Sequence, residues 1–170
     1  MTPTTKLDDR YSDNAATAIS WPDAQERLAG AEMAWLVTIR PDGRPHTTPL
    51  VPVWHEGHAY FHTGETEQKY VNLQANPHVL VLVGDGRWDG GLDIALEGTA
   101  RRVTDHALLQ AVADRYAARW DGRWTLTVRD GGFGNTADGE GFDSVLFEVT
   151  PTKAYAHAKG DPFGQTTYRF

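Results

Sequence analysis

The 170-residue sequence contains no cysteine. This absence excludes disulfides, thiolate-bound metals, iron–sulfur clusters and cysteine nucleophiles. It also fits a reducing compartment, and we expect a cytoplasmic protein. The only serines are Ser12, Ser20 and Ser144, and none lies in a nucleophile motif such as G-x-S-x-G. The sequence therefore offers no candidate for hydrolase chemistry, and an enzyme of this kind often depends on an organic cofactor.

Long apolar runs and concentrated positive charge are also missing. No stretch is long and apolar enough to span a membrane, and the polar first 20 residues lack the apolar core of a secretory signal. The formal net charge is -7, with scattered arginines, whereas nucleic-acid binding needs a concentrated basic face. We therefore expect neither a membrane nor a nucleic acid as a partner.

Composition favours one globular unit, because 40% of the residues are hydrophobic and 11% are aromatic. We expect residues 1–19 to form a flexible N-terminal arm and residues 20–170 to form a single domain. A helix is predicted from Ser20 to about Ala29, because Ser20 is a good cap, Pro22 falls in the first turn and Gly30 is a natural stop.

Strand signals dominate the rest of the domain, where β-forming runs alternate with turns such as Pro41-Asp42-Gly43-Arg44. The predicted strands are 33–40, 45–55, 58–63, 78–83, 92–103 and 142–149. Two more helices are predicted, over 66–75 and after Thr104-Asp105, whereas 130–141 is a glycine-rich loop and 150–170 an irregular tail. The fold class is therefore mainly β (α+β), a six-stranded antiparallel barrel with flanking helices.

The second and fourth of these strands have unusual compositions. The strand 45–55 contains Pro45, Pro49 and Pro52, which cannot donate to a sheet ladder, so we predict an irregular or edge strand. The strand 78–83 is almost entirely apolar, so we predict that it is buried on both faces.

Seven histidines raise the question of a metal site. The run His55-Glu56-Gly57-His58 resembles the zinc motif H-E-x-x-H but is one residue short. It also lies on a predicted turn, where the imidazoles would not share a helix face. A site built across strands with His46 or His62 is the alternative; we predict no metal and expect surface or hydrogen-bonded histidines.

One segment has a coherent reading as an anion site. The predicted strand ending at Thr63-Gly64 is followed at once by a helix, so it supplies a hydroxyl, free N–H groups and the charge of Lys69. These groups could hold a terminal phosphate. The alternative is an ordinary capped helix with a solvated lysine, which Glu65 and Glu67 favour because they would repel a phosphate.

Several motifs resemble the pyridoxamine 5′-phosphate oxidase-like family. They are W-L-V-T-I-R-P-D-G-R-P-H-T-T-P-L, A-Y-F-H-T-G, E-Q-K-Y-V-N-L-Q-A-N-P and G-L-D-I-A-L-E-G-T-A-R-R-V, and the likeness extends over most of residues 20–170. The resemblance implies a homodimeric split β-barrel with two cofactors at the subunit interface. It further implies a flavin-dependent oxidoreductase that exchanges hydride with a small-molecule substrate.

The resemblance also implies a set of site residues, grouped on the strand 45–55, at the strand end before Gly64 and on the helix after it. The implied cofactor-binding residues are His46, Thr47, Thr48, Pro49, Leu50, Val51, His62, Thr63, Gln68, Lys69 and Asp93. Candidate substrate contacts are Trp54, Trp88, Tyr168 and Arg169, each of which could equally serve the core or the rim. We assign Trp35, Trp120 and Trp124 to packing.

Two departures from the family pattern bear on the activity. The oxidases carry cations on the strand that here reads T-T-P-L-V-P-V-W, and an arginine where this chain has Gln68. Both differences argue against oxidation of pyridoxamine phosphate. We favour FMN over an 8-hydroxy-5-deazaflavin coenzyme of the F420 type, because the acidic chain offers no basic groove for a polyglutamate tail. Other possibilities are a non-catalytic flavin or haem carrier, with an axial histidine, and a structural dimer with an empty site.

Overall fold

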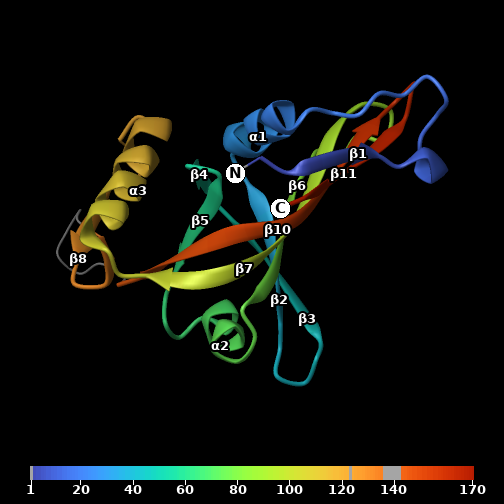
Figure 1. The fold of residues 1–170 in the computed structure, drawn as a ribbon. Helices are drawn as coiled ribbons and strands as arrows, with labels where there is room; N and C mark the ends of the chain where they lie inside the picture. Colours follow the sequence, from blue (N-terminus) through green and yellow to red (C-terminus); the bar gives the residue numbers. More distant parts are fainter. Residues whose placement is uncertain (1, 123, 136–142) are drawn as a thin grey trace.

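The computed structural model describes residues 2–122, 124–135 and 143–170, which form a strongly bent antiparallel sheet with flanking helices (Figure 1). The strands are β1 (Thr4–Leu7), β2 (Ala34–Ile39), β3 (Pro45–Leu50), β4 (Val53–His55), β5 (His58–Thr63), β6 (His78–Val83), β7 (Gly91–Val103), β8 (Leu126–Arg129), β9 (Gly132–Asn135), β10 (Val145–Lys159) and β11 (Gly164–Arg169). The helices are the 3-10 turn η1 (Asp9–Tyr11) and the α-helices α1 (Trp21–Gly30), α2 (Gln68–Ala75) and α3 (His106–Arg119).

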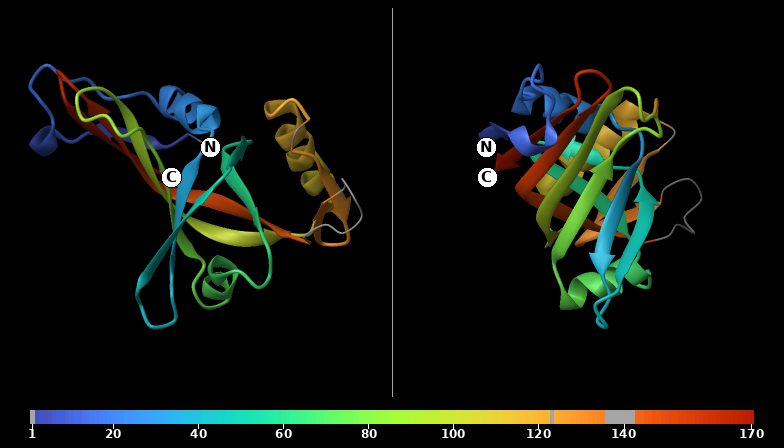
Figure 2. Two further views of the ribbon diagram at one scale, coloured as in Figure 1. Left: turned by 180° about the vertical axis from the view of Figure 1, so that it is seen from behind. Right: turned by 90° about the vertical axis from the view of Figure 1, so that its right-hand side faces the viewer.

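The long strand β10 organises the sheet. One edge of β10 pairs with β7, and the other pairs with β5 over Val145–Val149 and with β11 over Lys153–Ala158. From β7 the sheet continues through β6 and β2 to β3, and these strands lie side by side in the right-hand view of Figure 2. Because β5 and β11 leave the same edge of β10 at different heights, the sheet divides and curls, as expected for a split barrel.

Two apolar clusters stabilise this arrangement. The larger fills the barrel and receives Trp21, Ala24 and Leu28 from α1. This helix begins where predicted, because the Ser20 hydroxyl accepts the N–H of Asp23 at 3.3 Å. The smaller cluster lies where α3 packs on β4, β5 and the start of β10, with residues such as Tyr116 at its centre.

The two chain ends differ from the sequence prediction. The predicted arm contains β1, which pairs with β11 from Thr4↔Arg169 to Leu7↔Thr166. The predicted irregular tail is instead the second half of β10 followed by β11. Among the described residues the main sheet has nine strands rather than six, because β1 and β11 are added and the predicted strand 45–55 is two strands, β3 and β4. These segments were missed because they contain many polar residues; buried positions alternate in β11, whereas β1 has no buried residue.

Three internal predictions also need correction. The predicted strand 45–55 is interrupted into β3 and β4. In β6 only alternate residues are buried, so this strand covers the core with one face and not with both. The predicted glycine-rich loop begins as the β8–β9 hairpin, and residues 136–142 lie outside the described residues. Within the described parts of the chain, no helix is long and apolar enough to cross a membrane.

Candidate functional site

The candidate site lies where α2 packs against the sheet, at the lower end of the barrel in Figure 1. The spacing of Lys69, Asn72 and Leu73 places these residues on one face of α2, and all three are buried. Burial of a lysine is costly unless an anion accompanies the ammonium group. The position of Lys69 therefore already points to an anion beneath the start of this helix.

Three donors meet at that point, and we call them the anion cradle: the Thr63 hydroxyl, the Gly64 N–H and the Lys69 ammonium. The Gly64 N–H and the Lys69 ammonium bind the carboxylate of Glu67, and the Thr63 hydroxyl beside them donates to the Gly64 carbonyl at 3.3 Å. Gly64 N donates to Glu67 Oε1 at 2.8 Å, and Lys69 Nζ pairs with Glu67 Oε2. Burial opposes ionisation of Glu67, but Lys69, Gly64 and Thr63 outweigh it and hold the pKa of this carboxyl below its usual value.

A chain of polar side chains connects α2 to the sheet. Gln68 Nε2 donates to Asn72 Oδ1 at 2.8 Å, and Asn72 Nδ2 donates to Thr38 Oγ1 at 2.8 Å. Thr38 Oγ1 lies 3.5 Å from His46 Nδ1 on β3. Two predicted cofactor residues, Gln68 and His46, are thus linked through two residues that the sequence did not single out. Asn72 and Thr38 are both fully buried, so the chain fixes α2 relative to β2 and β3.

His46 lies in a positive environment. Its pKa is lowered, first by burial and then by the charges of Arg40 and Lys69. Since both causes disfavour the imidazolium, His46 stays neutral at pH 7 and can accept or donate a hydrogen bond without adding charge.

The backbone of β3 has an open edge. Arg40 N donates to the carbonyl of Arg44 at 2.9 Å, which fixes the parity of the β2–β3 hairpin. By that parity, Pro45, Thr47 and Pro49 turn their backbone groups away from β2. No other described strand pairs with this edge. The edge strand predicted from the prolines is therefore present, with the Thr47 N–H and neighbouring carbonyls free of the ladder.

His62 belongs to a different environment from its neighbour Thr63. Successive residues of a strand face opposite sides, and His62 points under α3, where its ring meets Trp124 and Phe133 edge-on. Its Nδ1 lies 3.0 Å from Ser144 Oγ. Burial lowers the pKa of His62 to about 4, so the imidazole is neutral at pH 7. The structure thus separates His62 from the anion cradle.

Asp93 also lies apart from the anion cradle. It begins β7 beside Lys159, with 3.0 Å between Asp93 Oδ1 and Lys159 Nζ, and it accepts the N–H of Asp85 at 3.2 Å. With Trp35 it lines an outer surface pocket of about 450 Å³. Trp35, which the sequence assigned to packing, is 52% exposed in the single chain and does not lie in its core.

The four predicted substrate contacts are not brought together. Tyr168 is fully buried, its hydroxyl donates to a main-chain carbonyl at 2.9 Å and its ring packs on Trp21. Trp54 also packs on Trp21, edge-on with 6.2 Å between the ring centroids. Trp88 is 88% exposed between β6 and β7, and Arg169 is exposed near the end of β11. Packing accounts for Tyr168 and Trp54.

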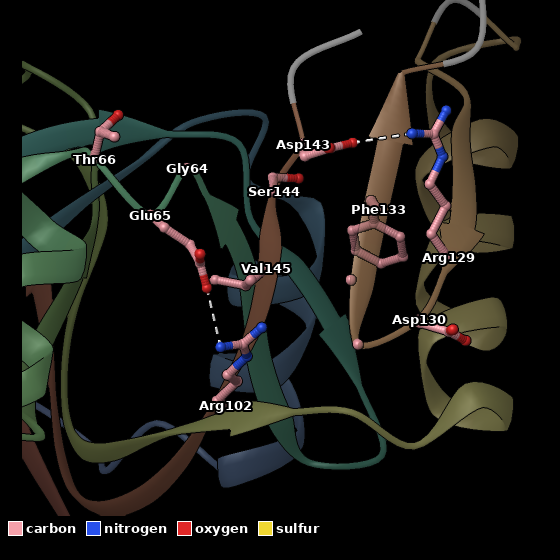
Figure 3. Close-up of a pocket in the computed structure, with 12 residues that line it drawn as sticks. Gly64, Glu65, Thr66, Arg102, Arg129, Asp130, Phe133, Asp143, Ser144 and Val145 are labelled. Atoms are coloured by element: carbon pink, nitrogen blue, oxygen red, sulfur yellow. Dashed lines mark hydrogen bonds and ion pairs between the residues drawn. The ribbon is translucent and has the colours of Figure 1, made fainter. Parts of the chain in front are cut away.

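A cleft of about 650 Å³ lies between residues 64–66, which precede α2, and the β8–β9 hairpin (Figure 3). Its two arginines are occupied by carboxylates: Arg102 Nη1 lies 3.0 Å from Glu65 Oε1, and Arg129 Nη1 lies 3.2 Å from Asp143 Oδ1. Because a third acid, Asp130, also lines it, the described lining does not favour an anion. The cleft borders Gly64 but contains neither Lys69 nor Thr63.

Among the described residues, no group of three or more His, Asp or Glu side chains could hold a metal ion. The sequence did carry one signal for the missed Asn72, because it lies three residues after Lys69 on the same helix face. Thr38 carried none, since only the fold brings it to α2.

The donor set fits the terminal phosphate that a flavin-type nucleotide would bring. A buried ammonium and a main-chain N–H converge on one carboxylate, with the Thr63 hydroxyl beside them, so their geometry suits an anion. The Thr48 hydroxyl on β3 is a buried polar atom without a hydrogen-bond partner among the described residues.

Comparison with solved structures supports the fold. A conserved hypothetical protein of Mycobacterium tuberculosis matches with a TM-score of 0.67 at 23% identity, covering 85% of this chain and 88% of that chain. An F420 reductase matches with a TM-score of 0.53 at 27% identity, covering 76% and 94%. A FAD-binding protein from Mesorhizobium loti matches with a TM-score of 0.56 at 16% identity, covering 98% and 99%.

No curated protein matches the chain. The family model described as pyridoxamine 5′-phosphate oxidase matches residues 20–158, which is most of the chain. This match supports a flavin-type oxidoreductase in the broad sense, whereas the likeness to the FAD-binding protein, at 16% identity, shows the fold alone. The chain belongs to the pyridoxamine 5′-phosphate oxidase family.

Proposed function

We propose that this protein is an FMN-binding oxidoreductase that transfers hydride between its flavin and a small organic substrate. The observation that carries the proposal is the anion cradle, in which the Gly64 N–H and the buried Lys69 converge on one anionic group beside the Thr63 hydroxyl. The match to the family model supports the same assignment.

In this proposal each part of the site has a separate task. Lys69, with the Gly64 N–H and the Thr63 hydroxyl, holds the terminal phosphate. The open edge of β3 offers the Thr47 N–H to the ring system, and a neutral His46 lies beside it. When bound, the flavin supplies the hydride-accepting atom N5, so the protein needs no nucleophile of its own and acts by orienting the ring and excluding water.

We further propose that the working form is a homodimer with the cofactors at the subunit interface. The outer faces of β2 and β6 carry apolar side chains, including the half-exposed Trp35 and the partly exposed Leu80 and Leu82. Contiguous apolar surface of this kind usually marks a protein interface. A second copy of the chain would cover it.

A deazaflavin coenzyme is the second candidate, favoured by the 27% identity to an F420 reductase. The same cradle would hold its phosphate. The formal net charge of -7 favours FMN, because a polyglutamate tail would meet a predominantly acidic chain. FMN and the deazaflavin coenzyme would therefore differ in the ring and in the polyglutamate tail, whereas the anion cradle would bind the phosphate of either.

The experiment is an absorbance spectrum of the purified protein, before and after incubation with excess FMN and desalting. We expect a retained flavin band, bleached by NAD(P)H or dithionite and restored by an added acceptor. Retention of the deazaflavin coenzyme instead of FMN would favour the second candidate, and a Soret band would indicate haem. Retention without turnover by any reductant and acceptor would indicate a carrier, and retention of no cofactor would refute the proposal.

A further inference from the structure

We propose that Glu67 is a built-in competitor for the anion cradle: its carboxylate takes the place of the ligand phosphate and must move out before a phosphate binds. The identity of the displaced ligand as a cofactor phosphate rests on the function proposed above. The competition itself rests on the contacts of Glu67, which use the same donors that a phosphate would need.

Glu67 occupies the donors that a phosphate would need. Glu67 Oε1 accepts the Gly64 N–H at 2.8 Å, while Oε2 pairs with Lys69 Nζ. Both carboxylate oxygens are therefore in use. Among the described residues, Glu67 is the anion that pairs with Lys69. While Glu67 stays, it occupies the single Gly64 N–H, and a second anion at the Lys69 ammonium would be repelled by its carboxylate.

The side chains of Glu67 and Lys69 differ in their exposure to solvent. The side chain of Glu67 is 37% exposed, whereas that of Lys69 is 10% exposed. Glu67 can therefore rotate toward water, but Lys69 has no comparable route and stays beneath α2. The cradle is thus a fixed cation with a removable anion.

Moving the Glu67 side chain away breaks few contacts. Glu67 is the N-cap residue of α2, yet its side chain makes no capping hydrogen bond to the helix. Its release therefore leaves the start of α2 as it is, and the cost is confined to the contacts with Gly64 and Lys69. The backbone N–H groups at this helix end also favour the incoming anion.

Selectivity follows from this competition. A monoanion offers Lys69 nothing more than Glu67 already provides, so it gains little by entering. A dianionic phosphate offers twice the charge and more acceptor oxygens, so it can displace the carboxylate. Glu67 would therefore discriminate in favour of phosphate-bearing ligands over carboxylates and small monoanions.

The test uses inorganic phosphate as the probe, with the whole chain, by isothermal titration and by thermal shift. The variants are Glu67→Gln, which keeps an acceptor for Gly64 N–H, and Glu67→Ala in case the amide finds a new partner. The matched control is Glu65→Gln, which removes the same charge two residues away, where Glu65 pairs with Arg102. A fourth variant combines Glu67→Gln with Lys69→Met.

We expect Glu67→Gln to tighten phosphate binding by at least about tenfold, the scale of one charge-assisted hydrogen bond that no longer has to be broken. Glu65→Gln should change it by less than about twofold, and the double variant should lose the gain. Unchanged or weaker phosphate binding in both Glu67 variants, or an equal gain in Glu65→Gln, would overturn the proposal.

Titrations with FMN and riboflavin separate this inference from the proposed function. If Glu67→Gln tightens FMN binding and leaves riboflavin unchanged, both hold. If wild type and Glu67→Gln bind FMN equally, the competition is refuted while the function stands. If phosphate behaves as expected but neither FMN nor the deazaflavin coenzyme binds, the function fails and the competition stands.

Discussion

Replacement of Asn72 by alanine should destabilise the protein strongly, because this fully buried amide connects α2 to the sheet. Its Nδ2 donates to Thr38 Oγ1 and its Oδ1 accepts from Gln68 Nε2, both at 2.8 Å. The Asn72→Ala variant removes both hydrogen bonds and leaves a small cavity between the helix and β2.

The size of the effect follows from these contacts. Two hydrogen bonds contribute about 1 kcal/mol each, and the unpaired hydroxyl together with the cavity adds about 1–2 kcal/mol. We therefore expect a loss of about 3–4 kcal/mol in the free energy of unfolding. Thr38→Val alone should also be costly, since it leaves the Asn72 amide buried without its acceptor. The double variant should cost less than the sum of the two, by about 0.5–1.5 kcal/mol.

The assay is urea denaturation followed by tryptophan fluorescence and circular dichroism, fitted for all four members of the cycle. Gln74→Ala is the matched control on the same helix, because Gln74 is exposed and should cost less than about 0.5 kcal/mol. A loss below about 0.5 kcal/mol in Asn72→Ala, or additive effects in the cycle, would refute the reasoning.

Three further predictions concern parts of the fold around the site. Since the pKa of His62 is lowered to about 4 in the folded chain, the free energy of unfolding should fall as the pH drops from about 6.5 toward 4. Tyr60→Phe should cost about 1.5–3 kcal/mol, because the buried Tyr60 hydroxyl donates to Glu148 Oε2 at 2.9 Å. Gly98→Ala should destabilise by about 1–3 kcal/mol, because its Cβ would lie 2.6 Å from a carbonyl oxygen of β10.

Each of these predictions has its own control. The pH dependence, measured by urea titration at several pH values, should flatten in His62→Gln; an equal slope there would assign it to other groups. Tyr60→Phe is measured by thermal denaturation. An unchanged midpoint temperature would contradict a stabilising role for the hydrogen bond to Glu148. Gly86→Ala is the control for Gly98, because a Cβ at Gly86 meets nothing within 4 Å, and equal effects at both positions would contradict the packing argument.

Local patterns in the sequence were sufficient for much of the fold. The cap at Ser20, the apolar stripe of α3 and the β-forming run of β5 each lie within a short segment, and the structure has these elements close to the predicted bounds. The pairing of β1 with β11 could not be predicted in the same way. It joins residues more than 150 positions apart, and both strands are polar on their exposed side.

The candidate site divides along the same line. Thr63, Gly64 and Lys69 lie within seven positions of each other, so their chemistry could be read directly from the sequence. The link from Gln68 to His46 passes through a residue of β2, so it depends on the tertiary fold. His62 was grouped with its neighbours although strand alternation turns it to the opposite face.

If Lys69 anchors the phosphate of a flavin-type cofactor, the protein should bind FMN more tightly than riboflavin, and this preference should depend on Lys69. This preference is measured by titration in wild type, in Lys69→Met and in the control Lys6→Met, which changes a lysine of β1. We predict that the preference falls by about 10- to 100-fold in Lys69→Met and is unchanged in Lys6→Met. An equal preference in wild type and Lys69→Met would contradict the claim.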